Sequence, residues 1–363
     1  MYRYKRLLVG VSFASQDGSS IRYAAMISRL AKSEKITFVH VVSKVDIPED
    51  LLEQYPDLFP PIDEYSQQEM EALVKEYFDG HPGAQLEYEV AEGSPLIELL
   101  RRAKQEKIDL IVMRKRRKPT ASGTLFEKLA RKAPCSLLFI PEGTGPQFTN
   151  ILVPTDFSEN SMDAMEVAVG LALASGTPEI HCLHVYEVPI GYYKTGKSYE
   201  EFAEIMKGHA EKNYQKFMKN VDLKGITATP IFKLEEKEYR GIEEVIEEQD
   251  IDLLIVGARG RKAGAGVLLG SVTEHLIQTT TIPLLAVKKK GTGMSILDAL
   301  VQSSPLVITF VPNFSLILSI VWSTFRSLTL LCSSSKSPGC ASSALFSRLE
   351  TATPMSLTFA LKG

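Results

Sequence analysis

The sequence predicts an α/β protein built from two tandem, doubly wound domains, each with a five-stranded parallel sheet. Two observations lead to this prediction. Short apolar runs without polar alternation, which are typical of strands covered on both faces, alternate with amphipathic segments of helix length. The whole pattern then occurs a second time along the chain, which indicates a duplicated domain.

The repeat is visible in the strand-like segments of both halves. Residues 7–14 align with residues 151–158, and residues 38–42 align with residues 182–186, at the same offset of 144. Residues 108–113 and 136–141 then match residues 251–256 and 283–288 after small insertions and deletions. We therefore expect domains over 1–144 and 145–290, followed by a tail over 291–363 that belongs to neither repeat.

The elements of the second half follow from its apolar runs and amphipathic segments. The runs predict strands near 150–155, 180–186, 226–232, 252–257 and 283–288. The segments between them predict helices near 159–175, 198–220, 239–249 and 269–279. Right-handed crossovers between parallel strands place ligands beyond the C-terminal strand ends, where the strand order reverses, so we expect the site there.

Composition narrows the class of protein. The chain is 44% hydrophobic and 23% charged with a formal net charge of -3, which is typical of a soluble globular protein and gives no sign of a nucleic-acid partner. The four cysteines have neither zinc-site spacing nor disulfide density, and no signal-peptide pattern opens the chain. These features favour a cytoplasmic location.

A glycine-rich segment follows the fourth strand of the second half. Gly257 and Gly260 come directly after the buried strand, and after nine residues Gly270 and Ser271 open the next helix. Without Cβ atoms the first two glycines let the backbone turn sharply and present N–H groups to an anion. The helix start favours a phosphate, with the Ser271 hydroxyl as an added donor or cap. One loop can therefore hold a polyphosphate at both ends.

This spacing, G-x-x-G, nine residues, then G-S/T, resembles the ATP-binding signature of the universal stress protein (UspA-like) family. The similarity covers both halves, about 290 of 363 residues. It implies a Rossmann-like, adenine nucleotide alpha hydrolase-like fold, and ATP, with or without Mg, as the ligand. It also implies that domains pair through the edge of the fifth strand, here Pro283 to Val287, within one chain. A homodimer and an unknown protein partner stay open.

The same resemblance assigns the residues of the ATP site, which are Pro154, Thr155, Asp156, Val185, Val256, Gly257, Gly260, Gly270, Ser271 and Val272. Those at the ends of the first two strands would contact the adenosine and adenine, Val256 would close the base pocket, and the glycine segment would hold ribose and phosphates. Arg259 and Arg261 could add charge. Two alternatives stay open: a loop that only turns a corner, and Asp156 as the cap of the helix beginning near Ser158.

The first half is predicted to be a degenerate copy with weak or no ATP binding. Arg114 and Arg117 stand where the second half has its first two glycines, and Ser12 replaces the aspartate, although Gly123-Thr124 still aligns with the helix start.

Two further features of the chain leave alternatives open. The basic run 114–118 is either a solvated loop or a patch for another anion or an acidic partner. His40 and His184 occupy equivalent strand-end positions, and we interpret them as packed, hydrogen-bonded residues in preference to proton-transfer groups.

No catalytic motif is visible. Residues 257–262 do not complete the GxxxxGK pattern of a P-loop enzyme, and HxGH-, SGGxDS- and GxSxG-type motifs do not occur. The sequence predicts a stress-response or signalling regulator that binds ATP without committed turnover, so no catalytic residue is assigned. The alternative is a slow ATPase in which a water near Asp156 or Ser271 attacks the γ-phosphate.

The tail differs in composition from both repeats, with 15 serines and only six charged residues after residue 290. Residues 299–325 carry no charge, and the apolar run 305–322 within them approaches the ~20-residue length of a membrane span, but prolines and an asparagine interrupt it. A low-complexity disordered tail, a membrane tether and translation in a shifted reading frame are the three interpretations, and the span is the disfavoured one.

Overall fold

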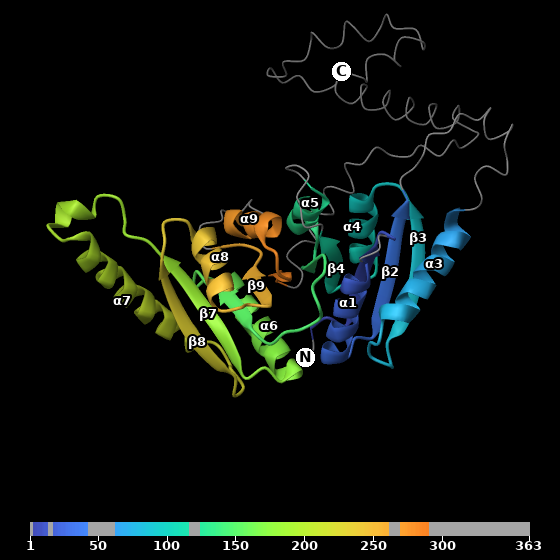
Figure 1. Ribbon diagram of the computed structural model, residues 1–363, viewed down its shortest axis with the longest axis horizontal. Coiled ribbons are helices and arrows are strands. Elements are labelled where there is room, and N and C mark those ends of the chain that lie inside the picture. Colours follow the sequence, from blue (N-terminus) through green and yellow to red (C-terminus); the bar gives the residue numbers. More distant parts are fainter. Residues whose placement is uncertain (1–2, 14–16, 43–61, 116–123, 261–268, 290–363) are drawn as a thin grey trace, which may run out of the picture. The chain divides into compact units, whose positions relative to one another are not determined.

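Figure 1 shows the computed structural model, which describes residues 3–13, 17–42, 62–115, 124–260 and 269–289. All described elements belong to one compact unit within Met1–Ser303. The first half contains β1 (Arg6–Val11), α1 (Gly18–Ala31), β2 (Lys35–Val42), α3 (Ile62–Tyr77), β3 (Gln85–Glu92), α4 (Pro95–Gln105), β4 (Leu110–Lys115), α5 (Leu125–Lys132) and β5 (Ser136–Pro141). The second half contains β6 (Ile151–Pro154), α6 (Glu159–Ser175), β7 (Glu179–Tyr186), η2 (Tyr192–Thr195), α7 (Tyr199–Met218), β8 (Thr227–Leu234), α8 (Glu238–Glu248), β9 (Leu253–Gly257), α9 (Ser271–Thr279) and β10 (Leu284–Val287).

The ten strands form one sheet in the order β3-β2-β1-β4-β5-β10-β9-β6-β7-β8. Within each half every pair of neighbouring strands is parallel. The order reverses between β1 and β4 in the first half, and between β6 and β9 in the second. The prediction of two doubly wound five-stranded domains is therefore confirmed, and each half has its own switch point.

The halves meet where β5 and β10 pair as antiparallel neighbours. Leu138 lies opposite Leu285, and this central pair is flanked by Phe139–Leu284 and Leu137–Ala286. By the repeat alignment, the two flanking pairs are equivalent to one another. The junction thus has a local pseudo-two-fold axis, and the expectation that the fifth strands pair within one chain is confirmed.

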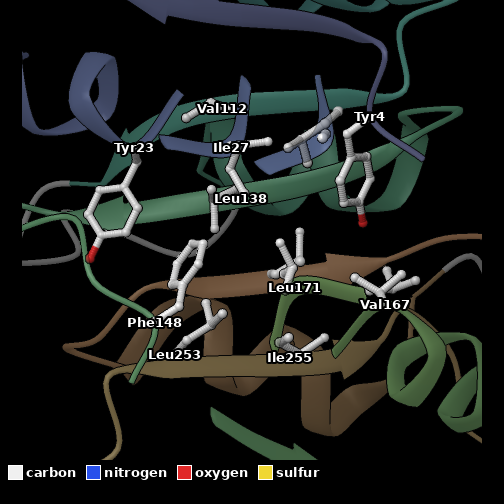
Figure 2. Close-up of a cluster of buried hydrophobic side chains, with 14 of the residues drawn as sticks. Tyr4, Tyr23, Ile27, Val112, Leu138, Phe148, Val167, Leu171, Leu253 and Ile255 are labelled. Carbon is white, nitrogen blue, oxygen red and sulfur yellow. The ribbon is translucent and has the colours of Figure 1, made fainter. Parts of the chain in front are cut away.

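Apolar side chains form one cluster on each face of the sheet. Helices α1, α3, α6 and α7 contribute to one cluster, and α4, α5, α8 and α9 contribute to the other. The first cluster runs across the junction, as Figure 2 shows for Leu138 of the first half and Leu171 and Ile255 of the second. Because both halves share each cluster, burial of apolar surface stabilises their association as well as each fold.

Local sequence signals explain several helix ends. Ser158 caps α6 by accepting a hydrogen bond from the backbone of Ser161, and Gly176, at a φ of 78°, ends the same helix in the left-handed conformation. Ser198 and Glu201 form a capping box at the start of α7. The predicted elements of the second half are all present, and the short helix η2 was not predicted.

Among the described residues, no helix is both long enough and apolar enough to cross a bilayer. The apolar run 299–325 and the rest of the tail lie outside them.

Cys135 and Cys182 are free and buried, and burial raises the pKa of both thiols to about 12. Both cysteines are therefore packing residues with little thiolate character.

Candidate functional site

The two central strands pair over a shorter length at the switch point of the second half than at that of the first. Strands β1 and β4 stay in register through four pairs, up to Gly10–Met113. Strands β6 and β9 pair only at Ile151–Leu253 and Leu152–Leu254. Pro154, which has no backbone N–H to donate, lies just beyond the last pair. The carboxyl ends of β6 and β9 therefore separate at the place where doubly wound sheets bind ligands.

A tight turn after β6 fixes Asp156. Its Oδ1 atom accepts hydrogen bonds from the backbone N–H of Ser158 at 3.1 Å and from the Ser161 hydroxyl at 2.6 Å. Phe157 has a φ of 61°, and its N–H donates to the Thr155 hydroxyl at 3.0 Å. The cap of α6 is Ser158, so the alternative that Asp156 is the helix cap is wrong. Asp156 instead closes a turn with its Oδ1 atom, and its Oδ2 atom faces Gly260, which follows β9.

The glycine segment meets this turn at close range. A Cβ atom on Gly260 would lie 3.0 Å from Asp156 Oδ2, and a Cβ on Gly270 would lie 3.4 Å from the backbone nitrogen of Gly260. A Cβ on Gly257 would lie 2.7 Å from the carbonyl oxygen of Asn160 in the first turn of α6. The structure thus brings together the turn after β6, the end of β9 and the start of α9. Asn160 was not predicted, because only its backbone takes part.

The start of α9 is tied to the end of β9. Gly270 donates its N–H to Ala258 O at 2.9 Å, and the Thr273 hydroxyl donates to Gly257 O at 2.9 Å. Ser271 is exposed at the first helical position, whereas the Val272 side chain packs against the apolar cluster under α9. The part of Val272 that can serve a ligand is therefore its backbone N–H. Residues 261–268, including Arg261, lie outside the described residues.

The remaining predicted residues line the strand ends. Val256 is 4% exposed in the core, and Thr155 is buried at 7%. Val185 is half-buried and packs against α8, where a Cβ on Gly241 would lie 3.0 Å from its Cγ2 atom. Arg259 is half-buried at the end of β9.

The histidine at the end of β7 has a structural role. His184 Nδ1 donates to Thr155 O at 2.8 Å, and its ring packs on Phe157 with ring centroids 4.3 Å apart. The equivalent His40 contacts Val11 O and Phe13 in the same way. The interpretation of both histidines as packed, hydrogen-bonded residues is confirmed.

An ion pair fills the corresponding position of the first half. The Arg114 guanidinium donates from Nε to Asp17 Oδ1 at 2.9 Å, from Nη2 to Ser12 Oγ at 3.2 Å, and from Nη1 to the Glu142 carboxylate. The side chains of Arg114 and Asp17 are only 8% and 1% exposed. Arg114 thus stands at the position equivalent to Gly257, where the second half has the backbone of Asn160 in close contact.

This burial corrects the prediction for the basic run. Arg114 and Lys115 are the last residues of β4 and both are buried, so neither a solvated loop nor an open anion patch describes them. Residues 116–118 lie outside the described residues. A basic run at the end of a buried strand can carry its charge into the core when the fold supplies partners.

Serine and aspartate exchange places between the two sites. In the first half, Ser12 follows β1 and donates its hydroxyl to Asp17 Oδ1 at 3.1 Å. In the second half, Asp156 follows β6 and accepts from Ser161. The offset of 144 pairs Ser12 with Asp156 and Asp17 with Ser161, so the signal was present in the sequence, but only the first replacement was predicted. The carboxylate faces the buried arginine in one half and the glycine segment in the other.

No group of three or more histidine, cysteine, aspartate or glutamate side chains gathers into a metal site among the described residues.

Together, the fold and this site define a doubly wound α/β protein in which glycines and an aspartate converge at one of its two switch points. A sequence profile of the universal stress protein family matches residues 3–141 and 147–288. The chain therefore belongs to the universal stress protein family and carries two copies of its domain in tandem.

Individual relatives agree with this assignment. The chain is 29% identical over 162 residues to universal stress protein MJ0577 of Methanocaldococcus jannaschii, covering 40% of this chain and 97% of the relative. It is similar in structure to a putative universal stress protein of Pseudomonas aeruginosa UCBPP-PA14, with a TM-score of 0.55, 15% identity, and 82% and 98% of the two chains covered. A universal stress protein of Archaeoglobus fulgidus DSM 4304 gives a TM-score of 0.51 at 17% identity, with 79% and 99% covered. The structural likenesses establish the fold.

Proposed function

We propose that the second half of this protein, over residues 145–290, binds ATP, and that the first half, over residues 1–144, does not. The observation that carries the proposal is the convergence of Asp156, Gly260 and Gly270 where β6 and β9 separate. In the first half, Ser12 stands in place of Asp156, and Arg114, the counterpart of Gly257, forms an ion pair with Asp17.

The roles follow from the geometry. The backbone N–H groups of Ser271 and Val272, at the positive end of the α9 dipole, serve the phosphates. Asp156 Oδ2, which faces Gly260, accepts a hydrogen bond from the ribose or the base. The hydrophobic side chains of Val185 and Val256 border the adenine. The glycines allow these segments to approach one another, because a Cβ on Gly257 or Gly260 would collide with Asn160 or Asp156.

We propose binding, and not turnover, as the biochemical role, with the ATP-bound state read by a partner protein in the cytoplasm. A slow ATPase is the second candidate, because the carboxylate of Asp156 faces the space that the phosphate-binding segment borders. The fate of the nucleotide separates the two. Intact ATP after prolonged incubation with Mg supports the sensor, and ADP release that is lost in Asp156→Asn supports the ATPase.

The test of binding is calorimetric titration of the full chain with ATP and Mg, beside Gly260→Ala. Outside its own chain neighbours, the added methyl group would meet only Asp156 among the described residues, with Oδ2 at 3.0 Å and Cγ at 4.0 Å. The fold should therefore survive while the site loses its space, and the affinity should fall by about tenfold or more.

Gly208→Ala is the matched control. Gly208 lies in α7, and a Cβ there meets nothing within 4 Å. It should bind ATP like the parent and be more stable by up to about 1 kcal/mol. In the parent, ATP at 100 times its dissociation constant should add ~2.7 kcal/mol to the free energy of unfolding. Absence of binding by a folded parent, or equal binding by Gly260→Ala, would contradict the proposal.

A further inference from the structure

Two lysines, Lys115 buried and Lys288 half-buried, reach across the junction between the halves. Lys115, the last residue of β4, donates from Nζ to the carbonyl oxygen of Thr280 at 2.9 Å. Lys288, just after β10, donates from Nζ to the carbonyl oxygen of Ala133 at 2.7 Å. Thr280 and Ala133 are the C-cap residues of α9 and α5. Each half thus supplies an ammonium group to the carboxyl end of the other half's last helix, where the dipole favours a cation.

Helix α9 is held by the first half near both of its ends. Lys115 binds its carboxyl end, and Arg131 of α5 forms an ion pair with Glu274 in its first turn. The helix has nine residues and is therefore about 13 Å long. A rigid rod of this length moves as one body, so a contact at Thr280 also sets the position of Gly270 and Ser271 at the other end.

The burial of Lys115 calls for an explanation. The residue is only 6% exposed, and desolvation of its ammonium group is unfavourable. An apolar side chain of similar length would fill the same volume without that penalty. The hydrogen bond from Lys115 to Thr280 holds α9 in a fixed position, which gives a reason for a charged residue to be retained here.

We propose that Lys115 is a positioning residue for the nucleotide site of the second half. By holding the carboxyl end of α9, it fixes the backbone N–H groups of Ser271 and Val272 at the depth where they meet the phosphates. This inference rests on the proposed function, because it assigns a residue of the first half to the ATP site of the second.

The reciprocal contact provides a matched control. Lys288 caps α5 as Lys115 caps α9, and burial lowers the pKa of both lysines to about 8. Helix α5, however, follows the site that Arg114 fills. Loss of the Lys288 contact should therefore disturb the junction to a similar degree without moving α9.

The experiment compares the full-length parent, Lys115→Met and Lys288→Met for binding of ATP and of adenosine by calorimetry. Adenosine has no phosphate and so does not depend on the start of α9. We expect Lys115→Met to weaken ATP binding by about threefold to tenfold, and to leave adenosine binding within about twofold of the parent. Lys288→Met should leave both affinities within about twofold. Lys115→Gln, which keeps an N–H donor of shorter reach, is the second variant if the methionine variant does not fold.

The outcomes separate this inference from the proposed function. A folded parent that binds neither ligand overturns both. A parent that binds ATP, with a folded Lys115 variant that binds ATP equally well, overturns the positioning role alone. Equal weakening of ATP and adenosine, or equal effects of the two lysine substitutions on ATP, also overturns it, because those results describe general damage to the junction.

Discussion

The guanidinium of Arg114 and the carboxylate of Asp17 form a buried ion pair at 2.9 Å, at the position that Gly257 occupies in the other half. A carboxylate that is 1% exposed depends on such a partner, since an unpaired charge in the interior is strongly unfavourable. The pair therefore stabilises the first half at the end of β4, where the second half has no such ion pair among the described residues.

Arg114→Gly should lower the free energy of unfolding by about 3 kcal/mol, because it leaves Asp17 buried without its main counter-charge. The measurement is urea unfolding followed by circular dichroism. The double variant Arg114→Gly, Asp17→Ser reproduces the glycine and serine of the second half, and it should recover most of the loss. A cost below about 1 kcal/mol in the single variant would show that Asp17 finds other partners.

Gly257→Ala should destabilise the protein by about 1–3 kcal/mol, because the new Cβ would lie 2.7 Å from the Asn160 carbonyl oxygen and a backbone atom cannot rotate away. The control is Gly10→Ala, whose Cβ would overlap only the flexible end of Met113. Thermal unfolding of both variants tests this. If Gly10→Ala proves the more costly change, the rigidity of the contact is not the deciding factor.

Leu138→Ala should cost about 2–5 kcal/mol, because this fully buried side chain lies on the central pair of the β5–β10 junction and its loss leaves a cavity shared by both halves. Leu285→Ala, its partner across the junction, should cost a similar amount. Leu173→Ala, at a position that is 43% exposed, should change stability by no more than about 0.5 kcal/mol. Unfolding in urea compares the three, and an inexpensive Leu138→Ala would argue against a shared core.

The parent should gain stability relative to Lys115→Met as pH rises from about 8 to 10.5. Burial lowers the pKa of Lys115 to about 8 in the folded chain, against an ordinary value of 10.5. Between these values the unfolded chain binds more protons, so raising the pH favours the folded state; below pH 8 the desolvation cost is present in full.

Urea unfolding of both proteins across this pH range makes the measurement. Cys135 and Cys182, with pKa values raised to about 12, lower stability above pH 9, but they do so in both proteins and cancel in the difference. A difference that stays flat across the range would mean that Lys115 keeps its ordinary pKa.

Most of the fold could be predicted because its signals are local or repeated. Strands buried on both faces leave apolar runs, and Ser158 and Gly176 mark the ends of α6. The glycine segment of the candidate site could be recognised because its spacing lies within one continuous stretch of the sequence. The buried roles of Arg114 and Lys115 were not, because a basic run has the composition of a solvated loop. The partner of Lys115 is also 165 residues away and is reached only through the antiparallel junction.

The pairing of Leu138 with Leu285 has a consequence for how such a protein can diverge. In a dimer of identical subunits, every substitution at the shared edge appears twice, so the two sides of the axis change together. Here each side is encoded separately. Arg131 pairs with Glu274 on one side, whereas the position equivalent to Arg131 in the second half is the uncharged Gln278. Joining the two copies into one polypeptide thus allows equivalent positions on the two sides of the axis to carry different residues.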